Sequence, residues 1–140
     1  MVKKLDPNAT LPSRAHPGDA GLDLCASEDL TLKPGARASV GTGIAIALPA
    51  GTAGFIVPRS GLAISHGLST PNAPGLIDEG YRGEVRVLVV NLDDSDAIEI
   101  RRGERIAQLV VQRVEQPEVI EVDDLPSSAR GEGGFGSTGR

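Results

Sequence analysis

The chain has 140 residues, of which 39% are hydrophobic, 24% charged and 2% aromatic, and its 18 glycines and 10 prolines occur too often for long helices. This composition predicts one small globular domain and excludes a helical bundle. The net charge of -5, the absence of a long apolar run and the lack of a signal peptide predict a cytoplasmic protein with no nucleic-acid or membrane partner. The single cysteine, Cys25, allows no intramolecular disulfide and no structural zinc site.

Apolar residues recur mainly at every second position, which predicts β-strands. The pattern is clearest in residues 43–48, 84–90 and 97–100. A further run with many β-branched residues covers residues 106–122 and is interrupted by Pro117, which is expected at a strand end or in a crossing segment. Segments rich in Gly, Pro, Asp and Asn separate these runs. Short strands joined by turns predict an all-β sandwich, jelly roll or barrel.

Two segments depart from the strand pattern. In residues 58–67, Ser60 is expected to cap a short helix that ends at Gly67. The last fifteen residues hold five glycines and one aromatic residue. We therefore expect an ordered domain over residues 1–125 and a flexible glycine-rich arm over residues 126–140.

Three segments carry polar side chains that could take part in binding or chemistry. Arg59, the Ser60 hydroxyl and the free N–H groups of the following turn would together attract an anion. Gln108 interrupts an apolar run, and a buried amide without a partner costs about 1 to 3 kcal/mol, so it is expected to bond to the backbone or to a ligand. Asp23 lies between two leucines. Taken alone, the arginine segment is more simply a capped turn, and Asp23 is more simply a solvated carboxylate on a strand.

Residues 72–85 contain an acidic pair, a glycine and the only tyrosine of the chain. We expect a β-hairpin that presents Asp78 as a base beside the flat ring of Tyr81. A hairpin loop with ordinary polar residues explains the same pattern. The tail from Arg130 onward is by itself a flexible terminus, although Phe135 among glycines and hydroxyls could become ordered over a ligand.

In this order, five segments resemble the five motifs of the trimeric dUTP diphosphatase (dUTPase) family. They are PGDAGLDLCA, PRSGLA, NAPGLIDEGYRGEV, RGERIAQLVVQ and RGEGGFGSTG, and they span residues 17–139. The resemblance implies a distorted jelly roll of mostly antiparallel strands with one short helix. It also implies a homotrimer with three active sites at subunit interfaces, which hydrolyses dUTP to dUMP and pyrophosphate with Mg²⁺. Such an enzyme keeps uracil out of DNA and supplies dUMP for dTTP synthesis.

The resemblance also implies a role for each matching residue. Asp78 would activate the water that attacks the α-phosphorus. Tyr81 would pack under the deoxyribose and exclude a 2′-hydroxyl, and Phe135 would stack on the uracil. Asp23 would act through water on Mg²⁺, which the substrate phosphates mainly hold. The implied substrate-binding residues are Arg59, Ser60, Gly61, Asn72, Leu76, Ile77, Tyr81, Arg86, Gln108, Arg130, Phe135, Gly136, Ser137 and Thr138.

Within that set, Asn72 and the backbone around Leu76, Ile77 and Arg86 would read the uracil edge. The arginine turn and Gln108 would bind phosphate oxygens, and the tail would cover the γ-phosphate. Two other functions are compatible with parts of the sequence. A dCTP deaminase shares part of the tyrosine motif, but it would carry a catalytic glutamate where this chain has Leu88. A noncatalytic β-sandwich would fit the composition but does not explain the motif series.

Overall fold

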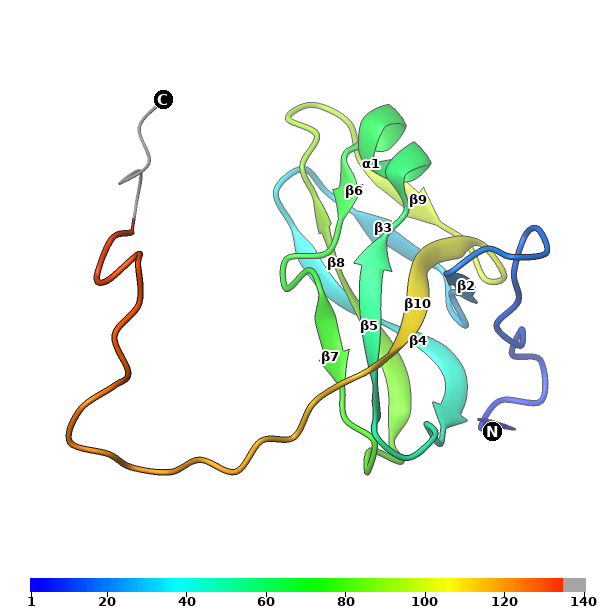
Figure 1. The fold of residues 1–140 in the computed structure, drawn as a ribbon. Helices are drawn as coiled ribbons and strands as arrows, with labels where there is room; N and C mark the ends of the chain where they lie inside the picture. The colour runs from blue at the N-terminus through cyan, green and yellow to red at the C-terminus, as the bar shows by residue number, and fades with distance from the viewer. Residues whose placement is uncertain (135–140) are drawn as a thin grey trace.

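The computed structural model describes residues 1–134 and contains ten strands and one short helix within them (Figure 1). The elements are β1 (Val2–Lys4), β2 (Leu22–Cys25), β3 (Leu30–Leu32), β4 (Arg37–Ile46), β5 (Thr52–Pro58), α1 (Ser60–His66), β6 (Leu68–Ser69), β7 (Gly75–Ile77), β8 (Glu84–Asn91), β9 (Ile98–Ile100) and β10 (Arg105–Arg113). No helix in this part of the chain is long and apolar enough to cross a membrane.

The strands form three sheets in which every pairing is antiparallel. One sheet has the order β1-β4-β8-β6, the second has the order β2-β10-β5-β7, and β3 pairs with β9. Many neighbours in these sheets are far apart in the sequence, as in jelly-roll folds. The predicted all-β, mostly antiparallel fold with one short helix is therefore confirmed.

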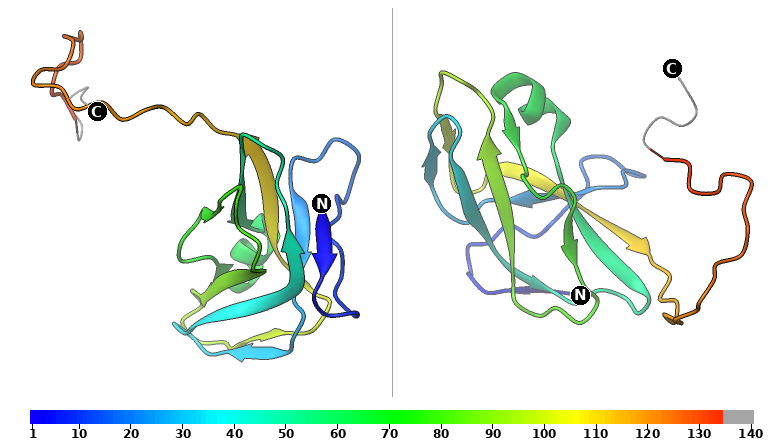
Figure 2. Two further views of the ribbon diagram at one scale, coloured as in Figure 1. Left: turned by 90° about the horizontal axis from the view of Figure 1, so that it is seen from below. Right: turned by 90° about the vertical axis from the view of Figure 1, so that its left-hand side faces the viewer.

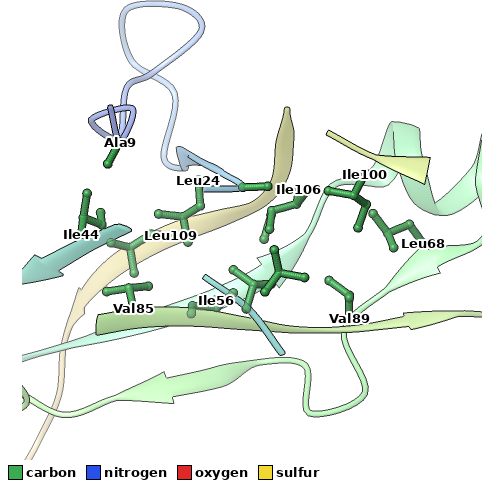
Figure 3. Close-up of a cluster of buried hydrophobic side chains, with 14 of the residues drawn as sticks. Ala9, Leu24, Ile44, Ile56, Leu68, Val85, Val89, Ile100, Ile106 and Leu109 are labelled. Atoms are coloured by element: carbon green, nitrogen blue, oxygen red, sulfur yellow. The ribbon is translucent and has the colours of Figure 1, made fainter. Parts of the chain in front are cut away.

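The hydrophobic core lies between the sheets (Figure 3). The alternating pattern of β8 places Val85, Val87 and Val89 in the core, as the spacing in the sequence predicts. Leu24 and Leu109 face them from the second sheet, and the β3–β9 pair closes one side of the core. This arrangement leaves the outward faces of the strands to carry polar and functional groups.

The short helix begins one residue earlier than predicted. Arg59, with φ -85° and ψ 121°, is the residue before the helix, and Ser60 is the first helical residue. No side chain caps the start of the helix, so the prediction that Ser60 caps it is wrong. Gly67 ends the helix with φ 67°, and its N–H donates to the Ala63 carbonyl, as predicted.

The predicted β-hairpin around Asp78 is wrong. β7 pairs with β5, whereas β8 pairs with β4 and β6, so residues 78–83 cross from one sheet to the other. The acidic and glycine residues mark a reversal of the chain, but they do not determine which strands pair. We call residues 78–83 the β7–β8 connection.

The chain after β10 extends away from the body of the molecule. All three views show residues 114–134 leaving the end of β10 as an extended segment (Figures 1 and 2). Its side chains include Val119 and Leu125, which are 95% and 85% exposed. The last strand thus ends at Arg113, before Pro117, while the division into residues 1–125 and 126–140 stays a prediction.

Candidate active site

A cavity of about 210 Å³ lies beside the β7–β8 connection. Its lining residues are Ile56, Asn72, Gly75, Leu76, Ile77, Asp78, Tyr81, Glu84, Val85 and Arg86. The five residues that the motif NAPGLIDEGYRGEV contributed to the predicted site, together with Arg86 directly after the motif, therefore line one cavity. We call it the connection cavity.

Local structure explains how the first part of this cavity forms. Because β7 alternates, Ile77 is buried in the core and Leu76 is 62% exposed. A Cβ atom on Gly75 would lie 3.1 Å from the Asn72 amide nitrogen, so the glycine gives the asparagine side chain its space. Asp78 follows directly after β7 and is exposed, so its carboxylate is accessible to water.

Backbone and side-chain bonds hold the β7–β8 connection. The Tyr81 N–H donates to the Asp78 carbonyl over 3.0 Å, which closes the turn. The Glu79 carboxylate accepts from the Gly51 N–H at 2.8 Å and ties the turn to the loop before β5. The Tyr81 hydroxyl donates to the Glu84 carbonyl over 2.9 Å. The acidic and aromatic residues are thus fixed relative to the cavity.

The Arg86 side chain bonds to protein groups around β4. Its guanidinium donates to the Ser39 carbonyl at 2.8 Å and forms ion pairs with Glu84 at 2.8 Å and Glu28 at 3.3 Å. The hydrogen bond to Glu84 is the main cause of a raised pKa of Arg86. With the guanidinium so engaged, the backbone of Arg86 is the part suited to recognise a ligand in the cavity.

A second polar cluster surrounds Asp23 on β2. Asp23 is only 5% exposed, and its carboxylate accepts from Gln108 at 3.1 Å and pairs with Arg59 at 3.5 Å and Arg105 at 3.1 Å. Asp23 is therefore not a solvated carboxylate, and the partner expected for the Gln108 amide is this aspartate. We call these four residues the arginine cluster.

Arg105 is the member of the arginine cluster that sequence reasoning missed. It lies three positions before Gln108, so in a regular strand the two side chains would point to opposite faces. The register of β10 against β2 shifts between Arg105 and Ala107, and this bulge turns Arg105 toward Asp23. Its carbonyl also accepts from Arg59 at 3.1 Å. The only signal in the sequence was a carboxylate between apolar residues, which requires cationic partners when it is buried.

Cys25 lies next to the arginine cluster and is buried. Burial raises the pKa of the Cys25 thiol, and the negative charge of Asp23 raises it further. A thiol with a raised pKa has little thiolate and is a poor nucleophile. The cysteine therefore packs beside the cluster without adding reactive chemistry to it.

The other predicted site residues lie outside both groups. Ser60 and Gly61 are exposed at the start of α1, directly after Arg59. Arg130 is exposed in the extended segment, where it donates to the Gly133 carbonyl at 2.8 Å. The last four predicted positions, Phe135, Gly136, Ser137 and Thr138, lie outside the described residues.

The connection cavity and the arginine cluster are far apart in a single chain. Asp78 directly follows β7 and Asp23 lies on β2, and these are the two edge strands of one sheet, three strand spacings or about 14 Å apart. Along the strands, Asp23 aligns with Val57 through Gln108, whereas Ile77 aligns with Gly54, so Asp78 is offset by about 13 Å. Arg59 follows β5, the neighbour of β7, but it lies six positions, or about 20 Å, along the strand from Ala53, which is opposite Asp78. One copy of the chain therefore does not bring Asp78 to Asp23 or to Arg59.

The donor groups in residues 1–134 fit Mg²⁺ only as a water-mediated ion. No three His, Cys, Asp or Glu side chains gather there as a metal site. Mg²⁺ keeps several waters and is commonly bound by one or two carboxylates together with substrate phosphates. Asp23 is the carboxylate in the described chain suited to such a role, because an ionised carboxylate can accept about four hydrogen bonds and its contacts with Gln108, Arg59 and Arg105 occupy three.

Comparisons with known proteins agree with the motif series. The model of the dUTPase family matches residues 7–139. A deoxyuridine 5′-triphosphate nucleotidohydrolase of Rhodococcus erythropolis is 62% identical over 138 residues, which cover 99% of this chain and 84% of that protein. The corresponding protein of Thermobifida fusca is 60% identical, over 99% of this chain and 77% of its own length.

Solved structures show the same fold. The dUTPase of Staphylococcus bacteriophage 80alpha with dUPNHPP has a TM-score of 0.91 and 34% identity, and the match covers 100% of this chain and 98% of that one. A mutant dUTPase of phage phi11 of S. aureus has a TM-score of 0.84 and 27% identity over 91% of this chain and 98% of its own. The description of the phi11 structure refers to the coordination of a structural Mg(II) ion.

Proposed function

This chain belongs to the dUTPase family and is a deoxyuridine 5′-triphosphate nucleotidohydrolase, and we propose that it releases dUMP and pyrophosphate by attack of water on the α-phosphorus of dUTP. The observation that carries this proposal is the connection cavity, which brings an exposed carboxylate, an aromatic ring and an amide side chain together. Those are the groups needed to activate water, to contact a sugar and to read a base. Removing dUTP in this way would keep uracil out of DNA and supply dUMP for dTTP synthesis.

In the proposed reaction Asp78 is the general base. Its carboxylate orients a water, accepts a proton as the water oxygen attacks phosphorus, and the bond to the pyrophosphate oxygen breaks. Exposure of Asp78 leaves room for that water. Because the carboxylate follows directly after β7, its position is set by the strand and by the Tyr81 to Asp78 backbone bond.

The connection cavity would select uracil and deoxyribose. Asn72 can donate and accept hydrogen bonds at the edge of a base, together with backbone groups near Leu76, Ile77 and Arg86. The 45% exposed Tyr81 offers an aromatic surface for the sugar. A ring in contact with C2′ leaves no space for the additional hydroxyl of a ribonucleotide.

The arginine cluster would bind the triphosphate. Arg59 and Arg105 add two positive charges around one carboxylate, so the cluster keeps a net positive charge that suits phosphate oxygens. Gln108 within the cluster, and Ser60 and Gly61 directly after Arg59, would supply further donors. Mg²⁺, bound by the phosphates and through water by Asp23, would neutralise charge on the triphosphate.

A complete site then requires more than one copy of the chain, and we propose a homotrimer with shared sites. The base must lie within hydrogen-bond reach of the water that attacks the bound phosphate. In one chain Asp78 and Asp23 of the arginine cluster are separated by about 14 Å across the sheet and about 13 Å along it. A neighbouring copy that brings its cluster to this cavity resolves the separation.

Exposed apolar surface supports the assembly. Phe55, Val57, Pro74 and Val110 line an apolar groove on the outward face of β5 and β10, although that sheet already covers the core with its other face. Apolar side chains on both faces of a sheet are typical of a sheet whose two faces are both covered by protein. The exposed Val119 and Leu125 in the extended segment add apolar surface that a neighbouring copy could cover.

The proposed reaction is tested by incubation with Mg²⁺ and dUTP, dCTP or UTP, followed by chromatographic separation of the products. Wild type should release dUMP and pyrophosphate from dUTP, with no ammonia from dCTP. Asp78→Asn should bind dUpNHpp with unchanged affinity but lose turnover by at least about a hundredfold. The matched control is Asp94→Asn, an exposed carboxylate outside the cavity, which should retain full activity. Near-normal turnover by Asp78→Asn would refute the assigned base.

We also propose that the enzyme acts in the cytoplasm. A single buried cysteine and no disulfide partner in the sequence are compatible with a reducing compartment. Fractionation of the native host cells followed by detection with an antibody against this chain would test the location. Recovery of the protein with secreted material would contradict it.

A further inference from the structure

Two local contacts fix the orientation of the Tyr81 ring. A Cβ atom built on Gly83 would collide with the phenol of Tyr81, so the ring lies directly over this glycine. At the other side, the Tyr81 hydroxyl donates to the Glu84 carbonyl over 2.9 Å. Because Tyr81 is 45% exposed, surrounding core residues do not hold the ring in this place. Its orientation therefore depends on Gly83 and Glu84, which follow two and three positions later in the chain.

Space, rather than backbone conformation, explains the glycine at position 83. Gly83 does not have the left-handed φ that seven other glycines adopt in residues 1–134. An alanine could therefore adopt the same backbone conformation without strain. The alanine methyl group would, however, displace the Tyr81 ring. Glycine is therefore required at position 83 because the Tyr81 side chain occupies the space of a Cβ atom.

The acceptor for the tyrosine hydroxyl is itself anchored. The Glu84 carboxylate accepts from the Gly43 N–H at 2.9 Å and pairs with Arg86 at 2.8 Å. Gly43 lies where the register of β4 against β8 shifts, and its φ is 68°. The first residue of β8 is thus fastened to β4 through its side chain, while its carbonyl holds the tyrosine.

We propose that Gly83 is a positioning residue for sugar selection: it lets the Tyr81 ring lie flat across the β7–β8 connection, with its hydroxyl on the anchored Glu84 carbonyl, in the orientation that excludes a 2′-hydroxyl. The proposal rests on the role of Tyr81 given under the proposed function. Under this proposal the selectivity depends on Tyr81 and also on the absence of a side chain at position 83, which leaves space for the ring. A methyl group at position 83 would displace the Tyr81 ring, and the connection cavity would then have space for the 2′-hydroxyl of a ribonucleotide.

The test compares kcat/KM for dUTP and for UTP in matched alanine variants. Gly83→Ala should reduce the dUTP to UTP ratio by at least about tenfold. Gly80→Ala is the control, because it lies in the same connection, lacks a left-handed φ and has open space around its Cβ position. It should keep the wild-type ratio. The thermal midpoints of both variants should stay within about 3 °C of wild type.

A double-mutant cycle shows whether Gly83 acts through the tyrosine. In a Tyr81→Ala background, adding Gly83→Ala should change the ratio by less than about twofold, since the ring is already absent. If Gly83→Ala alone does not fold but the double variant does, the collision with the ring is the cause, as proposed. If both fail to fold, Gly83 has a general structural role and the proposal is overturned.

The outcomes separate this proposal from the one on which it rests. If wild type prefers dUTP strongly over UTP and Gly83→Ala keeps that preference, the positioning role is wrong while the proposed function stands. If wild type itself does not prefer dUTP, the proposed sugar selection by Tyr81 fails, and the role of Gly83 fails with it. An equal fall of kcat/KM for both nucleotides would also overturn the positioning role.

Discussion

The Asn91 side chain lies at the end of β8 with no exposed surface, and its amide joins separate parts of the chain. The amide nitrogen donates to the Leu32 carbonyl at 2.9 Å and to the Asp96 carbonyl at 2.8 Å, and its oxygen accepts from the Asp93 N–H at 2.9 Å. These bonds connect β3, β8 and the loop before β9. They satisfy backbone groups that would otherwise be buried without partners.

Asn91→Ala should lower the free energy of unfolding by about 2 to 3 kcal/mol, because it leaves buried carbonyls and an N–H group without a bond. Urea denaturation followed by circular dichroism measures this change. Asn8→Ala is the control, since Asn8 is exposed and its side chain makes no bond in residues 1–134. Equal unfolding midpoints for the two variants would show that the Asn91 bonds contribute nothing net.

Individual site residues could be predicted from the sequence where a polar residue interrupts an apolar pattern. The pattern points to Asp23 and Gln108, and the structure brings their side chains together at 3.1 Å. Arg105 could not be found in this way, because its direction depends on a bulge in β10. A bulge results from the packing of strands distant in the sequence, and a local pattern does not contain that information.

At the scale of elements, the shift in β4 depends on Gly43. Its φ of 68° is in the left-handed region, and a Cβ atom there would lie 2.9 Å from the Ala9 side chain. Gly35 has a similar φ of 71° but has nothing within 4 Å of its Cβ position. Comparing alanine variants of Gly43 and Gly35 therefore separates the loss of stability caused by backbone strain from the loss caused by a collision.

Gly43→Ala should destabilise the protein by about 2 kcal/mol or more, whereas Gly35→Ala should cost only about 1 kcal/mol of backbone strain. Both values come from urea denaturation under the same conditions. The difference measures the collision with Ala9, which lies in the core and cannot move freely. Equal losses would mean that the structure around Ala9 accommodates the added methyl group.

The connection between β8 and β9 is organised by a carboxylate. Asp93 accepts from the N–H groups of Asp96 at 2.8 Å and Ser95 at 2.9 Å, and from the Ser95 hydroxyl at 3.0 Å. These bonds hold the pKa of Asp93 below its usual value of 3.8, and the bond from the Asp96 N–H has the largest effect. The folded chain therefore binds this proton less readily than the unfolded chain, and the stabilisation is complete above the unfolded-state pKa.

The contribution of Asp93 should disappear as the pH falls through its lowered, folded-state pKa. Asp93→Asn should therefore be less stable than wild type at about pH 7, and the gap should shrink below about pH 4. Thermal unfolding of both proteins over this range gives the measurement. Asp94→Asn, whose carboxylate makes no hydrogen bond in the described chain, should show no such trend. A gap that persists at low pH would contradict the assigned charge effect.

Strand positions followed from the alternation of apolar residues, but strand partners did not. Val85, Val87 and Val89 face the core as predicted, whereas β7 and β8 belong to different sheets. The alternation records which face of a strand is buried, and turn residues record where the chain reverses. Neither determines whether the next strand stays in the same sheet, because that depends on how two sheets close around one core.

At the scale of the whole molecule, the proposed trimer predicts that two inactive variants repair each other. Asp78→Asn subunits can be refolded together with subunits that lack residues 130–140. Suppose that each site takes Asp78 from one subunit and the tail from the next. In a random mixture of equal amounts of the two variants, one quarter of the sites then contain both an intact Asp78 and an intact tail. Activity should therefore recover to about a quarter of wild type.

Light scattering and native mass spectrometry would first show that the mixture contains mixed trimers. Each variant refolded alone serves as the control and should stay nearly inactive. The truncated variant should still form trimers, since Phe135 is the only large apolar residue in the sequence of the removed segment. Mixed trimers without recovered activity would show that the tail completes the site of its own subunit.

The distance between the connection cavity and the arginine cluster also determines how the enzyme responds to dilution. A lone chain has the proposed general base and the proposed uracil cavity beside β7, whereas Asp23 and Arg105 of the proposed phosphate site lie on β2 and β10. Turnover per chain should then fall as the total protein concentration drops below the dissociation constant of the assembly, even with saturating nucleotide. Catalytic rate becomes a readout of subunit association, and a molecule that only separates subunits would act as an inhibitor without ever entering the nucleotide pocket.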